Sequence, residues 1–104
     1  MPFVHTIDMG FISGVHDSRE ILLHQMLSVG CDKLVDLGYL LPDGTLPKLR
    51  LALHPPHRVD LVSAMCQVSP KVTGEMVQQV LVRLKYIVTH GWAAYYLKCV
   101  SISK

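Results

Sequence analysis

Charged side chains are scarce in this sequence. Lys, Arg, Asp and Glu make up 17% of its 104 residues, against about 25% in an average soluble domain. Ten basic and eight acidic residues leave a net charge of +2 with histidine neutral, which is too small to drive nucleic-acid binding through a bulk field alone. Half of the residues are apolar and the mean hydropathy is +0.33. This excess predicts either a well-filled core or an apolar surface that a partner or a second copy covers.

Cysteine is also sparse. Cys31, Cys66 and Cys99 are widely spaced and form no CxxC pair, so we expect reduced thiols and no disulfide framework. No apolar run reaches the roughly 18 residues that cross a bilayer. The N-terminus lacks the basic region followed by an apolar region that marks a signal peptide. We therefore expect an intracellular protein, cytoplasmic or nuclear, with no transmembrane segment.

Signatures of catalysis are missing as well. The phosphate-binding patterns GxGxxG and GxxxxGK[ST] and the GxSxG nucleophile elbow do not occur. His16 and Asp17 are adjacent but have no clear nucleophile beside them, and we interpret Asp17 as a helix cap. His54 and His57 flank a Pro pair, yet a structural zinc needs a second pair of ligands, and Cys66 does not supply one. We predict no catalytic residue, no metal and no cofactor.

Two segments have helical periodicity. Apolar residues recur along 17–37, and a capping-box pattern opens that segment. The stronger pattern covers 74–90, where apolar residues recur at three- and four-residue spacing. Thr73 is placed to cap this second helix and Gly91 to end it. Between the helices, the Pro-Asp-Gly sequence within 41–45 predicts a tight turn and a short hairpin.

The remaining patterns favour strands. Segment 3–12 alternates in part, 49–54 alternates clearly, and 59–66 alternates too, with a short helix as its alternative. The aromatic and β-branched run 92–104 predicts a last strand. Residues 1–104 are thus expected to form a single α+β domain. Its mostly antiparallel sheet has four to five strands, with two helices on one face, and a ferredoxin-like βαββαβ order is the simplest topology.

Two parts of the surface are candidates for binding. Basic residues gather in 48–58, where one strand face would be cationic and could meet phosphates of RNA or of an anionic membrane. An ordinary solvated edge strand would have the same pattern. The aromatic strand 92–104 has an edge that another chain could join. The candidate contact residues are Lys48, Arg50, His54, His57, Arg58, Trp92, Tyr95 and Tyr96.

The C-terminal run from Tyr86 to Lys104 reads YIVTHGWAAYYLKCVSISK. Its order of amphipathic helix, short turn and aromatic strand resembles the close of a rhabdovirus matrix protein. The likeness covers about a fifth of the chain and assigns no role to any single residue. It implies a non-enzymatic viral protein that self-associates beneath a membrane and contacts nucleocapsid.

We expect a non-catalytic interaction or assembly protein, possessing no cofactor, that self-associates as a homo-oligomer such as a dimer or pairs with a protein partner. The first alternative is a small nucleic-acid-binding protein that uses the basic segment 48–58 together with Lys71, Arg83 and Lys85. The second alternative is a small metal- or thiol-dependent enzyme. Its candidate residues are His54, His57, Cys66 and the His16–Asp17 pair.

Overall fold

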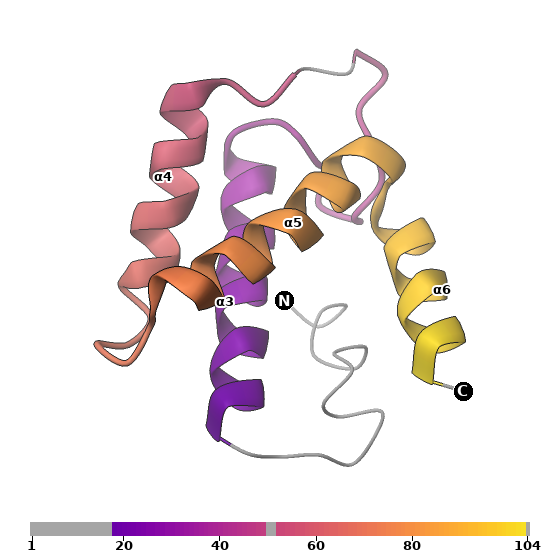
Figure 1. The fold of residues 1–104 in the computed structure, drawn as a ribbon. Coiled ribbons are helices and arrows are strands. Elements are labelled where there is room, and N and C mark those ends of the chain that lie inside the picture. Colours follow the sequence, from indigo (N-terminus) through magenta and orange to yellow (C-terminus); the bar gives the residue numbers. More distant parts are fainter. Residues whose placement is uncertain (1–17, 50–51, 104) are drawn as a thin grey trace.

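The computed structural model describes residues 18–49 and 52–103, and these residues form a helical fold (Figure 1). No strand occurs in either described range. The predicted α+β fold with its antiparallel sheet is therefore wrong. The helices are α3 (Ser18–Asp36), α4 (Pro55–Cys66), α5 (Gly74–His90) and α6 (Trp92–Ser103).

Helix α3 confirms the helix predicted for 17–37. It ends where Gly38 takes a φ of +89°, a left-handed conformation that glycine adopts without strain. The Tyr39 N–H then donates to the Leu34 carbonyl at 2.9 Å, which turns the chain back after the helix. The side chains of Tyr39 and Leu40 are buried there. The buried residues of α3 lie on the side that faces α4 and α5: Leu22, Leu23, His24, Met26, Leu27, Gly30, Cys31 and Leu34.

Helix α5 confirms the helix predicted for 74–90. The Thr73 hydroxyl accepts the Met76 N–H at 3.2 Å, and this contact satisfies one of the free N–H groups of the first turn. Gly91 has a φ of +89° and ends the helix. Helix α5 is central among the described helices because it packs against α3, α4 and α6. Its buried stripe consists of Met76, Val77, Val80, Leu81, Leu84 and Ile87.

The turn predicted for 41–45 is present. The Leu41 N–H donates to the Thr45 carbonyl at 2.9 Å, and Gly44 has a φ of +86°. The Asp43 carboxylate accepts the Thr45 N–H at 2.9 Å and the Thr45 hydroxyl at 2.6 Å, and these bonds lower the pKa of Asp43. No strands flank the turn in the described residues, so the predicted hairpin is wrong. Instead, the Trp92 N–H donates to the Gly44 carbonyl at 3.1 Å and ties the turn to the start of α6.

Of the strands predicted for 49–54 and 59–66, the described residues form neither. Residues 52–54 are irregular, and 59–66 belongs to α4, as the short-helix alternative expected. The Pro pair between His54 and His57 opens α4. Proline suits the first turn of a helix because its missing N–H would have no partner there. Leu61 and Met65 are buried and four residues apart, which is helical spacing.

The strand predicted for 92–104 is also wrong, because Trp92–Ser103 is helix α6. Among the α6 residues whose burial is described, 92–99, the buried ones are Trp92, Tyr95 and Cys99, which are spaced by three and four residues and so share one helix face. Burial of this face against α5 outweighs the β-propensity of the segment, which is a weak and context-dependent preference. The strand predicted for 3–12 lies outside the described residues.

Candidate binding groove between α5 and α6

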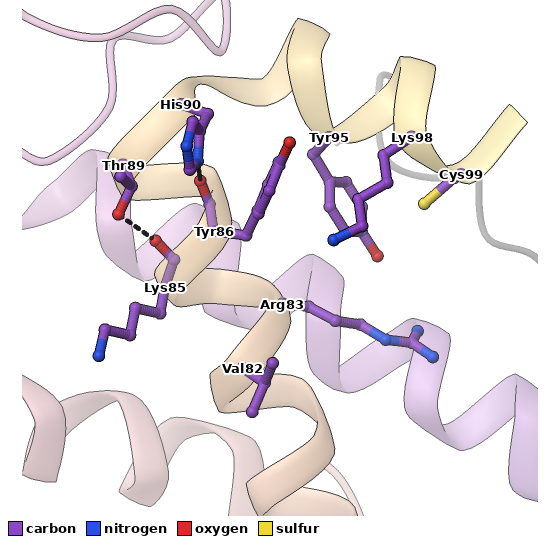
Figure 2. Close-up of a pocket in the computed structure, with 9 residues that line it drawn as sticks. All are labelled: Val82, Arg83, Lys85, Tyr86, Thr89, His90, Tyr95, Lys98 and Cys99. Atoms are coloured by element: carbon purple, nitrogen blue, oxygen red, sulfur yellow. Dashed lines mark hydrogen bonds between the residues drawn. The ribbon is translucent and has the colours of Figure 1, made fainter. Parts of the chain in front are cut away.

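A hollow of about 390 Å³ opens between α5 and α6 (Figure 2). It forms because Gly91 turns the chain sharply between the two helices, so the last two turns of α5 face the first two turns of α6. We call this hollow the groove. The described residues that line it are Val82, Arg83, Lys85, Tyr86, Thr89, His90, Tyr95, Lys98 and Cys99.

Tyr86 stands at the centre of the groove. The His90 ring stacks on it with a centroid distance of 4.2 Å and an interplanar angle of 27°, since residues four apart on a helix are neighbours. The Lys98 Nζ lies 4.5 Å from the Tyr86 centroid, within the range of a cation–π contact. Figure 2 shows His90 and Lys98 on opposite sides of the Tyr86 ring.

The floor and the rim of the groove differ in character. Tyr95 and Cys99 are buried, and the Tyr95 ring lies 6.3 Å from the Tyr86 ring. Lys85 and Lys98 are exposed at the rim. The groove therefore combines an aromatic and apolar interior with ammonium groups at its mouth.

The surroundings of the groove are basic. None of its described lining residues is acidic, and the sequence has no Asp or Glu after Glu75. Glu75 lies in the first turn of α5, where its Oε1 is 3.1 Å from Nη2 of Arg19 in an exposed ion pair. The field at the groove therefore favours an anionic ligand.

The groove is lined by aromatic, apolar and basic side chains. Cys99 is buried in its floor, and the lining contains no carboxylate among the described residues that could act as a general base. Across 18–49 and 52–103, no three His, Cys, Asp or Glu side chains are grouped so as to hold a metal ion.

The predicted candidates His54 and His57 lie at the start of α4, away from the groove lining. Their rings are 5.7 Å apart at an angle of 84°. The Tyr39 hydroxyl donates to the Ala52 carbonyl at 3.0 Å, accepts the His54 N–H at 3.1 Å and lies 2.7 Å from His57 Nδ1. Because the hydroxyl has one hydrogen, which Ala52 accepts, His57 Nδ1 is the donor in the third contact. Both histidines thus help to hold the start of α4 against Tyr39, three residues beyond the end of α3.

The other basic candidates are Lys48, Arg50 and Arg58. Lys48 is exposed in the connection before α4 and lines neither the groove nor a second hollow that Arg58 lines. Arg50 lies outside the described residues. The described residues of 48–58 contain no strand, because 52–54 are irregular and 55–58 open α4.

The aromatic candidates have different places on α6. Trp92 and Tyr95 are buried, with ring centroids 5.3 Å apart, and Tyr95 also lines the groove. Tyr96 is 40% exposed. The sequence interpretation missed Tyr86, His90 and Lys98 as a group. Had residues 92–103 been interpreted as a helix, Lys98 would have been placed on a helix that follows directly after the one with Tyr86 and His90, and the three side chains could have been grouped.

Comparison of the chain with protein-family models, with curated proteins and with solved structures finds no significant match. Among the described residues, no helix has both the length and the apolar character needed to cross a bilayer.

Proposed function

We propose that this protein is a non-catalytic protein-binding module that receives an acidic segment of a partner protein, with one large apolar side chain of that segment seated in the groove between α5 and α6. The observation that carries the proposal is the combination of an aromatic interior with Lys85 and Lys98 at the rim and no acidic residue in the described lining. Such a site desolvates an apolar anchor and pairs with carboxylates beside it.

The size of the groove supports an anchor side chain. A volume of about 390 Å³ is at the lower end of the roughly 300–1,000 Å³ of ligand-binding cavities. Interface energy is concentrated in a few buried aromatic or aliphatic anchors that fill such pockets. Carboxylates next to the anchor would meet Lys85 and Lys98, which fixes orientation and speeds association.

A protein segment fits these features better than a nucleic acid does. Single-stranded nucleic acid is bound by aromatic rings with open faces in a strongly positive channel. Both sides of Tyr86 are occupied, by His90 and by Lys98, and the net charge is only +2. The sequence also predicts self-association, so a second copy of this chain is the competing occupant of the groove, and the experiment below distinguishes the two.

A pair of small probes tests the anchor site on the full chain. Indole-3-acetate joins an aromatic ring to a carboxylate, and tryptamine joins the same ring to an ammonium group. At about 0.3 kcal/mol per heavy atom, indole-3-acetate should bind with a Kd near ~1 mM. We expect it to shift the amide resonances of 82–99 in ¹H–¹⁵N spectra, whereas tryptamine binds at least ~10-fold more weakly because Lys85 and Lys98 repel it.

Charge-reversal variants provide the control for this experiment. Lys98→Glu should weaken indole-3-acetate binding by ~5-fold or more, and Lys71→Glu, an exposed lysine outside the groove lining, should not change it. Equal binding of the two probes, or shifts confined to other helices, would contradict the proposal. A dT oligonucleotide that shifts the same resonances would assign the groove to nucleic acid. Sedimentation that shows a dimer abolished by Lys98→Glu would assign it to a second copy.

A further inference from the structure

A second hollow, of about 410 Å³, lies beside the groove. Arg58 of α4 and Gln78 and Leu81 of α5 line it, and Val82 and Lys85 line both it and the groove. Val82 is 70% exposed, so an apolar residue and a cation stand together on the ridge between the two hollows. The two hollows therefore form one continuous surface along α5.

The arrangement of the helices leaves this surface open. Helix α5 lies between α4 and α6 (Figure 1), and α4 and α6 do not contact each other in the described part of the chain. No described helix covers the strip of α5 between them. Both hollows have a cation, Arg58 in one and Lys98 in the other, with Lys85 between, and none of the described lining residues is acidic.

The strip has the dimensions of a short helix. The lining residues on α5 extend from Gln78 to His90, which at ~1.5 Å per residue corresponds to about 18 Å. A partner helix of about three turns has this length. Two of its apolar residues seven positions apart share a face and are about 10 Å apart, so one can enter each hollow.

A helical occupant also satisfies its own backbone hydrogen bonds. An extended segment would present unpaired N–H and C=O groups to this surface. The residues of α5 that line the hollows lie inside a helix, where their backbone groups are already bonded, and no strand edge exists among the described residues to complete a ladder.

We infer that the partner segment is an acidic amphipathic helix of about three turns that lies along α5, seats one apolar anchor in each hollow and sets carboxylates against Arg58, Lys85 and Lys98. This inference rests on the proposed function, and it adds the second hollow, the helical form of the ligand and the contact with Arg58.

Three helical peptides of about 14 residues, rich in Glu and Ala, test the inference by fluorescence anisotropy with the full chain. The two-anchor peptide has Trp and Leu seven positions apart. The one-anchor peptide has Ala in place of Leu, and the displaced peptide has its Leu moved by two positions, which places it on another face. We expect the two-anchor peptide to bind at least ~10-fold more tightly than the other two, since only its Leu side chain is removed from water in the second hollow.

Charge-reversal variants locate each contact. Arg58→Glu should raise the Kd of the two-anchor peptide ~5-fold or more. It should change the Kd of the one-anchor peptide by less than ~2-fold. Lys98→Glu should raise the Kd of both peptides, and Lys71→Glu should change the Kd of neither. Urea unfolding of each variant verifies that the fold is intact.

The outcomes separate this inference from the proposed function. Equal binding of the one-anchor and two-anchor peptides, weakened by Lys98→Glu and unchanged by Arg58→Glu, would overturn the inference and leave the proposed function standing. No binding of any peptide, together with no effect of indole-3-acetate on the groove, would overturn both. Displacement of the bound two-anchor peptide by a synthetic peptide of residues 1–17 would assign the surface to this chain's own N-terminal sequence and overturn the inference.

Discussion

Tyr39 and His57, eighteen positions apart, are joined by a hydrogen bond of 2.7 Å between the Tyr39 hydroxyl and His57 Nδ1. The same hydroxyl bonds the Ala52 carbonyl and the His54 N–H, and the Tyr39 ring meets the His57 ring edge-on at 5.4 Å. One side chain just after α3 thus holds the first turn of α4. This contact also positions Arg58, the next residue, at the second hollow.

Replacing Tyr39 with Phe should therefore destabilise the protein. The substitution keeps the buried ring and removes the hydroxyl, so one donor and two acceptor contacts are lost in a partly buried place. We expect the free energy of unfolding to fall by about 1–3 kcal/mol, measured by urea denaturation. Tyr96→Phe, on the exposed side of α6, is the matched control and should change it by less than about 0.5 kcal/mol. Equal effects of the two variants would argue against the role of the Tyr39 hydroxyl.

Gly30 sets the distance between α3 and α5. A Cβ at this position would lie 2.6 Å from Cδ1 of Leu84, and Leu84 is almost fully buried, so its side chain has little room to move. Gly30→Ala should cost about 1–3 kcal/mol of unfolding free energy through overpacking. Gly74→Ala is the control, because nothing lies within 4 Å of its added Cβ, and it should be neutral or slightly stabilising.

A double variant shows whether the Gly30 effect acts through Leu84. If the clash is the cause, Gly30→Ala combined with Leu84→Ala should destabilise by less than the sum of the two single variants, by about 0.5 kcal/mol or more. Strict additivity would mean that Gly30 matters for another reason.

Thr73 should contribute to stability through its cap. Thr73→Ala removes the acceptor of the Met76 N–H and should lower the free energy of unfolding by about 1 kcal/mol. Thr73→Ser keeps the hydroxyl and should remain within a few tenths of a kcal/mol of the natural protein. Thermal denaturation of the three proteins provides the comparison. A Ser variant as unstable as the Ala variant would show that the threonine methyl group, and not the cap, is responsible.

The three cysteines should differ in reactivity. Cys66 is exposed, whereas Cys31 and Cys99 are buried, and burial raises the pKa of Cys31 to about 12. The thiolate is the reactive form, so at pH 8 a disulfide reagent should modify Cys66 at least ~100-fold faster than Cys31. At pH 10 Cys31 should still be protonated and slow to react, because this pH remains below the pKa of its thiol. Mass spectrometry of the modified peptides identifies each site. Fast labelling of Cys31 in the folded protein would contradict its placement in the core.

Local signals in the sequence predicted three elements. The helices at 17–37 and 74–90 and the turn at 41–45 each have their own start or stop residue: a capping threonine, a terminal glycine, or a proline and glycine at turn positions. The apolar stripes of the two helices are long enough for the helical period to be unambiguous.

The two wrong strand predictions, for 59–66 and 92–104, have a shared cause. Segments 59–66 and 92–103 are short, and their apolar residues fit alternation as well as they fit a helical stripe. Alternation favoured strands, and the aromatic residues of 92–103 strengthened that interpretation. Which of the two periods is correct depends on the neighbouring element that buries the residues. In α6 that neighbour is α5, and packing against it buries residues at helical spacing.

The sequence by itself determined the two long helices, the turn at 41–45 and the absence of Asp and Glu after Glu75, because each depends on residues near one another in the chain. Tertiary structure alone decided that the segment after Gly91 is a helix that folds back along α5. It thereby decided that Tyr86 and His90 face Lys98 across the groove, and that Arg58 joins Lys85 in the second hollow. The physical reason is that a groove is made by side chains from separate helices, and its shape and charge exist only once packing has brought those helices together.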